Sequence, residues 1–235
     1  MAARTADRRG SPQIRIETCF IRGRGDLVSV RGGRRFELDL YSSLAALDGS
    51  LVSAVGQSKD TAAPGPANVR LRRVTALTEH LIELRVGRDD DRTAVGLPAV
   101  VQIACDNCLL AASAGRPLVQ VDGAESDEQI RQLVVWSSPP DARPTFYANP
   151  GPALLDVQPA HPDRMPQPGP YDRERWLTFT RDRTADPFVR LKFAASGLTT
   201  AQPNEFRPKF LETAPPGADE CGAPIDRLPA PMSDE

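Results

Sequence analysis

Short segments in which apolar and polar residues alternate run through most of this chain. In residues 13–20, Ile14 and Ile16 share one face of an extended segment and charged residues share the other. A period of two is typical of a β-strand with one buried face. The same alternation predicts strands at three further places, which are residues 35–41, 80–86 and 188–193.

Continuous apolar runs add more strands, and turn residues separate them. The runs cover residues 99–104, 118–121, 133–136 and 176–180, and they predict strands buried on both faces. Turn signals such as Gly32-Gly33 and Asp122-Gly123 fall between the segments. No helical segment long enough to cross between parallel strands is evident. We therefore expect a mainly β protein, an antiparallel β-sandwich or a jelly-roll-like domain.

Only two segments carry helix signals. Ser126 precedes Asp127, Glu128 and Gln129 in the manner of a helix cap, and the following apolar run predicts that a short helix leads directly into a strand. Residues 42–55 have leucines at helical spacing but also a hairpin signal at Asp48-Gly49. That second segment is left undecided between helix and hairpin. No internal repeat of fixed period is apparent.

Proline divides the chain. Residues 137–170 hold ten prolines, which disfavour both helix and central strand, so this segment is expected to be an extended connector lying against a surface. The expected organisation lists five parts: a basic arm (1–12), a β-rich core (13–136), the connector (137–170), strands completing the core (171–211) and an acidic, proline-rich tail (212–235).

Charge is distributed unevenly although the net charge is only −2. Arginines crowd the first 35 residues, whereas acids dominate the last 24. The two ends are expected to be flexible, and their opposite charges favour contacts between copies of the chain or with other subunits. Removing 1–12 or 212–235 is expected to spare the folded monomer but to weaken such association.

The same composition bears on location. No stretch approaches the ~20 apolar residues of a membrane helix. The first residues lack the apolar region of a secretory signal. We therefore expect a protein of the cytoplasm or of an assembled particle, with no membrane partner.

The sharpest local motif is Cys105-Asp-Asn-Cys108. A pair of cysteines with this spacing can bind a metal ion or form a disulfide, but no second pair exists to complete a zinc site. Free thiols are expected for all four cysteines, which include Cys19 and Cys221. Cys105 and Cys108 are therefore interpreted as turn residues, with a metal or thiol enzyme as the minor alternative and no cofactor expected.

Other reactive residues are few. His80 falls on the apolar face of its predicted strand and is interpreted as a hydrogen-bonded core histidine, and His161 lies among the connector prolines. Asp89, Asp90 and Asp91 form an acidic run without the spacing of a calcium loop, which indicates a solvated turn. No nucleophile motif accompanies these residues, so no catalytic residue is predicted.

Arginine and glycine together mark a candidate binding region near the N-terminus. The residues that could contact a partner or neutralise nucleic-acid phosphates are Arg8, Arg9, Arg22, Arg24, Arg31, Arg34 and Arg35. The interleaved aromatic residues of a stacking surface are missing. An ordinary solvated surface is the competing interpretation, because arginine exceeds lysine throughout this chain.

These observations favour binding over catalysis. The first hypothesis is a non-enzymatic structural or assembly protein, such as a subunit of a coat, a capsid or virion, or another multi-subunit particle. The second is a nucleic-acid-binding accessory protein that uses the arginines of residues 1–35. The third is an enzyme with a metal or thiol site at Cys105 and Cys108.

Overall fold

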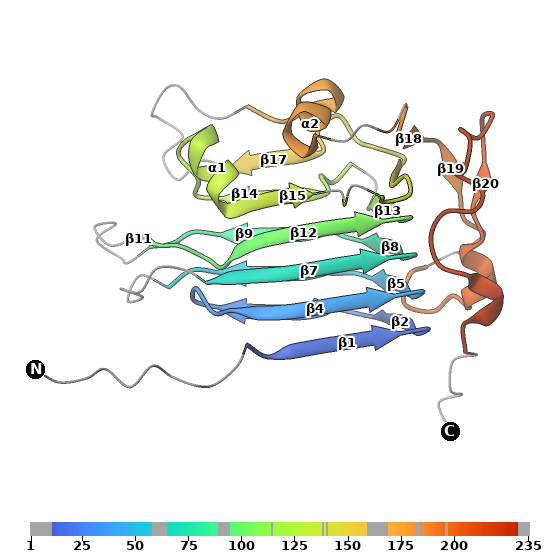
Figure 1. The fold of residues 1–235 in the computed structure, drawn as a ribbon, viewed down its shortest axis with the longest axis horizontal. Coiled ribbons are helices and arrows are strands. Elements are labelled where there is room, and N and C mark those ends of the chain that lie inside the picture. The colour runs from blue at the N-terminus through green and yellow to red at the C-terminus, as the bar shows by residue number, and fades with distance from the viewer. Residues whose placement is uncertain are drawn as a thin grey trace, which may run out of the picture.

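A computed structural model of the chain describes most of residues 11–229, and the strands wind into a three-sided solenoid (Figure 1). Outside the description lie residues 1–10, 58–64, 89–94, 159–168 and 230–235 and the positions 114, 138, 140, 182, 183, 185 and 196. Each turn of the solenoid, here called a coil, contributes one strand to each of three parallel sheets, A, B and C. Coils stack so that equivalent strands pair side by side.

The three sheets are named by the order in which the chain visits them. Sheet A contains β1 (Gln13–Glu17), β4 (Phe36–Tyr41), β7 (Pro66–Arg72), β12 (Val100–Asp106) and β15 (Val134–Ser137). Sheet B contains β2 (Phe20–Gly23), β5 (Leu44–Leu47), β8 (Thr75–Thr78), β13 (Leu109–Ala112), β16 (Phe146–Ala148) and β18 (Phe188–Val189). Sheet C contains β3 (Val28–Arg31), β6 (Val52–Val55), β9 (Ile82–Arg85), β14 (Val119–Asp122) and β17 (Leu155–Gln158).

The prediction of an antiparallel sandwich or jelly roll is wrong, because every strand pair within sheets A, B and C is parallel. Leu38 of β4, for example, lies beside Val69 of β7, and Val69 lies beside Ile103 of β12. Two neighbouring parallel strands must be joined by a long connection, which is usually a helix. A parallel sheet was not predicted because the sequence showed no such helices. Here two further strands of the same coil make that connection, so no helix is required.

Coils of unequal length explain why no repeat is visible in the sequence. Successive register partners along sheet A are Ile14, Leu38, Val69, Ile103 and Trp136, which are 24, 31, 34 and 33 residues apart. The corner between sheets A and B is nevertheless constant. Its first residue has a positive φ in four successive coils, at Thr18, Ser42, Arg73 and Asn107. Four different residue types adopt this left-handed conformation, so the corner leaves no sequence signature.

The core is a column of apolar side chains inside the solenoid. Inward residues of one strand stack on those of the next coil, as Val28 does on Val52 and Val52 on Ile82. Val52 and Ile82 are almost wholly buried. The segment left undecided between helix and hairpin supplies β5 and β6, two strands of one coil. The proline-rich segment supplies β16 and β17.

Two helices cover the end of the solenoid that holds β15 and β17 (Figure 1). The predicted helix after Ser126 is confirmed as α1 (Asp127–Leu133), which runs directly into β15. Residues 176–180 were expected to form a strand, but they belong to α2 (Arg173–Thr180), capped by Asp172. Arg175 of α2 pairs with Asp127 of α1 and stacks on Tyr171, which ties the two helices together.

A C-terminal extension covers the outer face of sheet B. It contains β19 (Leu191–Lys192), η1 (Pro203–Phe206), β20 (Lys209–Phe210) and η2 (Ile225–Arg227). A separate short hairpin, formed by β10 (Gly87–Arg88) and β11 (Val95–Gly96), lies in the connection between β9 and β12. Phe206, Ala218 and Cys221 of the extension pack with Leu109 and Phe146 in a second apolar cluster. Part of the segment interpreted as an acidic tail therefore lies in a packed core.

We expect removal of residues 212–235 to lower the free energy of unfolding by about 3 kcal/mol, because it uncovers apolar side chains such as Leu109. It also removes Ala223, whose backbone N–H donates to the Thr75 hydroxyl at 3.0 Å. Urea unfolding followed by circular dichroism would measure the change. Removing only residues 230–235 is the control, since it leaves every described contact intact. An equal midpoint for the two truncations would contradict this packing.

Candidate assembly interface

Among the strands that the structure describes, the first coil forms the free edge of all three sheets. It consists of β1, β2 and β3, which occupy the terminal positions of sheets A, B and C respectively. In Figure 1, β1 and β2 lie at the end of the solenoid opposite the two helices. Unpaired edges of this kind expose rows of backbone donors and acceptors to any strand that can pair with them.

Apolar side chains at this end are incompletely covered. Ile14 is in register with Leu38, yet Ile14 is 37% exposed whereas Leu38 is fully buried. Ile16, Ile21 and Val30 also point into the core and are only partly buried. In the second, third and fourth coils, inward side chains are buried because a neighbouring coil lies on each side along the solenoid axis. In the first coil, the described residues provide cover on one side only.

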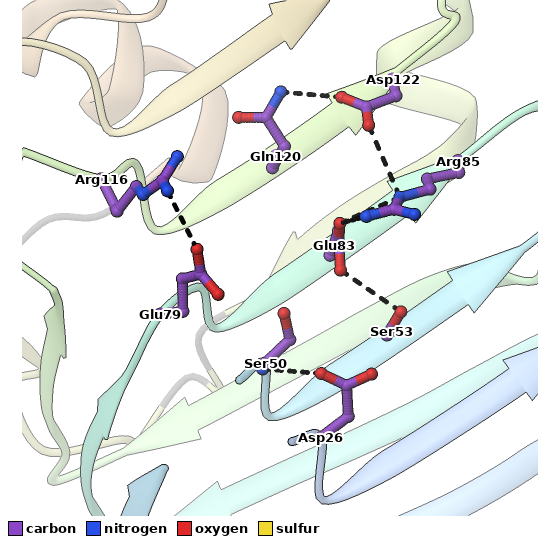
Figure 2. Close-up of polar contacts among 9 residues, drawn as sticks. All are labelled: Asp26, Ser50, Ser53, Glu79, Glu83, Arg85, Arg116, Gln120 and Asp122. Carbon is purple, nitrogen blue, oxygen red and sulfur yellow. Dashed lines mark hydrogen bonds and ion pairs between the residues drawn. The ribbon is translucent and has the colours of Figure 1, made fainter. Parts of the chain in front are cut away.

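Several polar contacts hold the first coil in a defined position. The Asp26 carboxylate accepts a hydrogen bond from the Ser50 backbone N–H at 2.8 Å, which joins the first and second coils at the corner between sheets B and C (Figure 2). The Cys19 N–H donates to the Ser43 hydroxyl at 3.1 Å. These contacts hold the first coil against the second.

The arginines predicted to bind a partner are spread over different sides of this coil. Arg22 on β2 donates to the carbonyl oxygens of Thr200 and Ala201 at 3.1 and 3.2 Å, and thereby anchors the C-terminal extension. Arg24 lies at the corner between sheets B and C, and Arg31, Arg34 and Arg35 lie where the chain passes from sheet C to sheet A. Arg8 and Arg9 fall outside the described residues. Among those described, Arg24 and Arg22 are thus separated from the other three.

The outer face of sheet C carries a ladder of paired polar groups (Figure 2). Arg85 contacts Glu83 of its own strand and reaches Asp122 of the next coil at 3.6 Å. At the adjacent corner, Arg116 lies 3.2 Å from Glu79. Figure 2 thus shows carboxylates spread over several coils and each engaged with a neighbouring side chain or backbone group, as on an ordinary solvent-facing surface.

A shallow depression of about 510 Å³ lies on the outer face of sheet A. It is lined by alternating charges, and two of its ion pairs join successive coils, namely Arg70 with Asp39 at 3.4 Å and Arg72 with Asp106 at 3.3 Å. The carboxylates are each satisfied by a guanidinium. They do not form a pair of isolated acids of the kind that acid–base catalysis uses.

The cysteine motif lies inside the solenoid and not on its surface. Cys105 and Cys108 flank the corner between β12 and β13 and are 1% and 0% exposed. The Cys108 thiol lies 3.3 Å from the Leu71 carbonyl oxygen, and the Cys221 thiol donates to the Cys108 carbonyl at 2.9 Å. Burial raises the pKa of Cys221, which makes it a poor nucleophile at neutral pH. All four cysteines are free thiols, as predicted.

The remaining predictions concern histidine and acidic residues. His80 is confirmed as a buried, hydrogen-bonded histidine, with its Nδ1 2.8 Å from the Pro117 carbonyl oxygen. His161 and the run Asp89, Asp90 and Asp91 lie outside the described residues. Within the described ranges, no group of three or more histidine, cysteine and acidic side chains is arranged to hold a metal ion.

Two further findings bear on identity. Over the described part of the chain, no helix has both the length and the apolar character needed to cross a membrane. Comparison with protein-family models, curated proteins and solved structures returned no match for this chain.

Proposed function

We propose that this chain is a non-enzymatic structural protein, a β-solenoid that joins a larger assembly through its first coil. The observation that carries the proposal is the asymmetry of the two ends. One end of the core column is covered by α2, whose Trp176 is fully buried, whereas the other end leaves Ile14 exposed beside three free strand edges. Exposed edges with an apolar lining are the features that strand-mediated association uses.

The polar surface supports an assembly role over catalysis. Carboxylates on sheets A and C are paired with arginines in neighbouring strands, as Asp39 is with Arg70 and Asp106 with Arg72. Such pairs engage the surface carboxylates with guanidinium groups without creating a reactive group. The capsid and virion interpretation drew on a sandwich or jelly-roll shape, and the parallel solenoid removes that basis.

Light scattering coupled to size-exclusion chromatography tests the proposal. The full-length chain should elute with a molar mass of at least twice its 25.5 kDa, because covering the first coil buries Ile14 and pairs free backbone groups. The variant Ile14→Lys places a charge on this end without disturbing a fully buried side chain, and it should shift the mass toward that of the monomer. Val135→Lys is the matched control, since Val135 is 42% exposed on the outer face of the last coil. A monomer at every concentration, with wild-type and both variants alike, would refute the assembly role.

Nucleic-acid binding is the second candidate, and one observation favours it. The first coil and the connection after it, residues 13–35, contain six arginines against two carboxylates, Glu17 and Asp26. An oligonucleotide added in the same scattering experiment should then raise the mass, and rising salt should reverse the increase as phosphate contacts are lost. An unchanged mass with oligonucleotide at low salt would exclude this function.

A further inference from the structure

The free edge of β1 has a defined hydrogen-bonding pattern. The Glu37 N–H donates to the Pro12 carbonyl at 2.8 Å, and the Thr18 N–H donates to the Tyr41 carbonyl at 2.9 Å. Even-numbered residues of this segment therefore direct their backbone groups toward β4. Because successive residues of a strand alternate sides, the N–H and C=O groups of Gln13, Arg15 and Glu17 point to the free edge.

From this edge we propose a specific partner, a second copy of the chain, bound head to head across a two-fold axis. This inference rests on the proposed assembly function and names its geometry. In the dimer, β1 pairs antiparallel with β1 of the second copy, and the axis passes beside Ile16. The exposed inward residues of the two first coils then cover each other, so that one core column continues through both copies.

Register and charge select Ile16 as the centre. Arg15 and Glu17 contact each other within β1 and are both solvent-exposed. A centre at Ile16 also places Arg15 opposite Glu17 of the second copy in both halves of the contact, and both residues belong to the set whose backbone groups face the free edge. Opposite charges in such cross-strand pairs are stabilising. A centre at Arg15 would instead place two arginines directly opposite each other, which is destabilising.

The same axis also accounts for the other two edges. The two-fold axis passes through the middle of the sheet A side and through the opposite corner, between sheets B and C. Rotation by 180° about it keeps the sheet A side in place and exchanges the sheet B and sheet C sides. The edge of β2 consequently lies opposite the edge of β3 from the second copy. Because the contact is isologous and α2 covers the far end of the core, this contact by itself gives a closed dimer.

Net charge gives this dimer a distinctive response to salt. Outside the Arg15–Glu17 pairing, residues 13–35 of each copy carry five arginines against one carboxylate, so the two first coils have like net charge. Exposed charges are screened over ~8–10 Å at physiological ionic strength. Salt screens the Arg15–Glu17 attraction as well as this repulsion, so dimerisation should depend only weakly on salt, whereas docking of an acidic protein or of nucleic acid at the same end should weaken as salt rises.

A charge exchange tests the register. Arg15→Glu places two carboxylates opposite each other at both Arg15–Glu17 pairings, and we expect it to weaken dimerisation by about tenfold. The double variant Arg15→Glu/Glu17→Arg restores opposite charges and should return the dissociation constant to near its wild-type value. Both side chains are solvent-exposed, so circular dichroism should report an unchanged fold. Failure of the double variant to recover would overturn the Ile16-centred register.

Disulfide trapping provides a second test in a Cys19→Ser background. Residues that face each other without mutual hydrogen bonds lie ~4.5 Å apart at Cα, within the range of a disulfide. Ile16→Cys should therefore give a covalent dimer when the purified protein is oxidised with diamide. Gln13→Cys is the matched control, because the two copies of residue 13 are six positions apart along the strands, about 20 Å.

The outcomes separate this inference from the proposed function. A mass above 25.5 kDa without crosslinking at residue 16 would leave assembly standing but overturn the head-to-head dimer. A monomer under all conditions would overturn both. A monomer that dimerises only after removal of residues 1–10 would show that the chain's own N-terminal segment covers the first coil, which also overturns the inference.

Discussion

Replacing Trp176 with alanine should lower the free energy of unfolding by about 3–5 kcal/mol, the range for removing a buried aromatic side chain. Trp176 is fully buried and lies at the centre of an aromatic cluster. Its ring is 5.0 Å from that of Trp136 on β15 and 5.7 Å from that of Tyr147 on β16, centroid to centroid. Its loss would detach α2 and uncover the end of the core.

Trp176→Phe separates packing from hydrogen bonding at the same position. The Trp176 indole Nε1 is buried and has no hydrogen-bond partner among the described residues, so phenylalanine removes an unsatisfied donor while retaining an aromatic ring. We expect it to cost less than half as much as alanine. Denaturant unfolding followed by far-ultraviolet circular dichroism would measure both variants. An alanine variant within about 1 kcal/mol of wild type would show that α2 does not close the core.

Strand positions could be predicted from this sequence because alternation reports which face of a segment is buried. Leu38 and Leu40 alternate with Glu37 and Asp39, and the leucines do lie inside the solenoid. The pattern does not report which strand lies beside another or in which direction it runs. A sandwich and a solenoid both bury one face of β4, so the sequence pattern could not distinguish them.

Apolar runs carried a second ambiguity. Leu109 and Leu110 are consecutive and both buried in β13, a strand that was not among the predicted apolar runs. Leu110 faces the interior of the solenoid, whereas Leu109 faces outward and is covered by the C-terminal extension. The extension itself could not be foreseen, because residues after 211 are rich in proline and acid and have few large apolar side chains.

Only part of the candidate interface could be predicted from the sequence. The arginines enriched near the N-terminus include several on the first coil, but the corners of this coil place Arg22 and Arg31 on different sheets. Ile14 and Ile16 were interpreted as core residues, and they do face the core. Their exposure follows from the position of β1 at a sheet edge, which depends on long-range pairing and on no local pattern.

Substitution of the glycines at the connections between sheet C and sheet A, like that of Trp176, should also destabilise the fold strongly. Gly56, Gly87 and Gly96 lie where three backbone segments approach each other closely. A Cβ atom added at Gly96 would lie 1.9 Å from the carbonyl oxygen of Gln57, and one added at Gly56 would lie 1.9 Å from the carbonyl oxygen of Gly96. The obstructing atoms are backbone, so no side-chain rotation can relieve either contact.

Gly96→Ala should therefore destabilise the protein by about 3 kcal/mol, at the upper end of the usual range for overpacking, because two backbone segments must separate. For a chain of this size that corresponds to a decrease of roughly 10 °C in the melting temperature. Gly151→Ala is the matched control, since the nearest atom to its added Cβ would lie 3.7 Å away, an ordinary contact. Thermal unfolding of the two variants measures the difference, and equal melting temperatures would mean that these connections are not packed backbone against backbone.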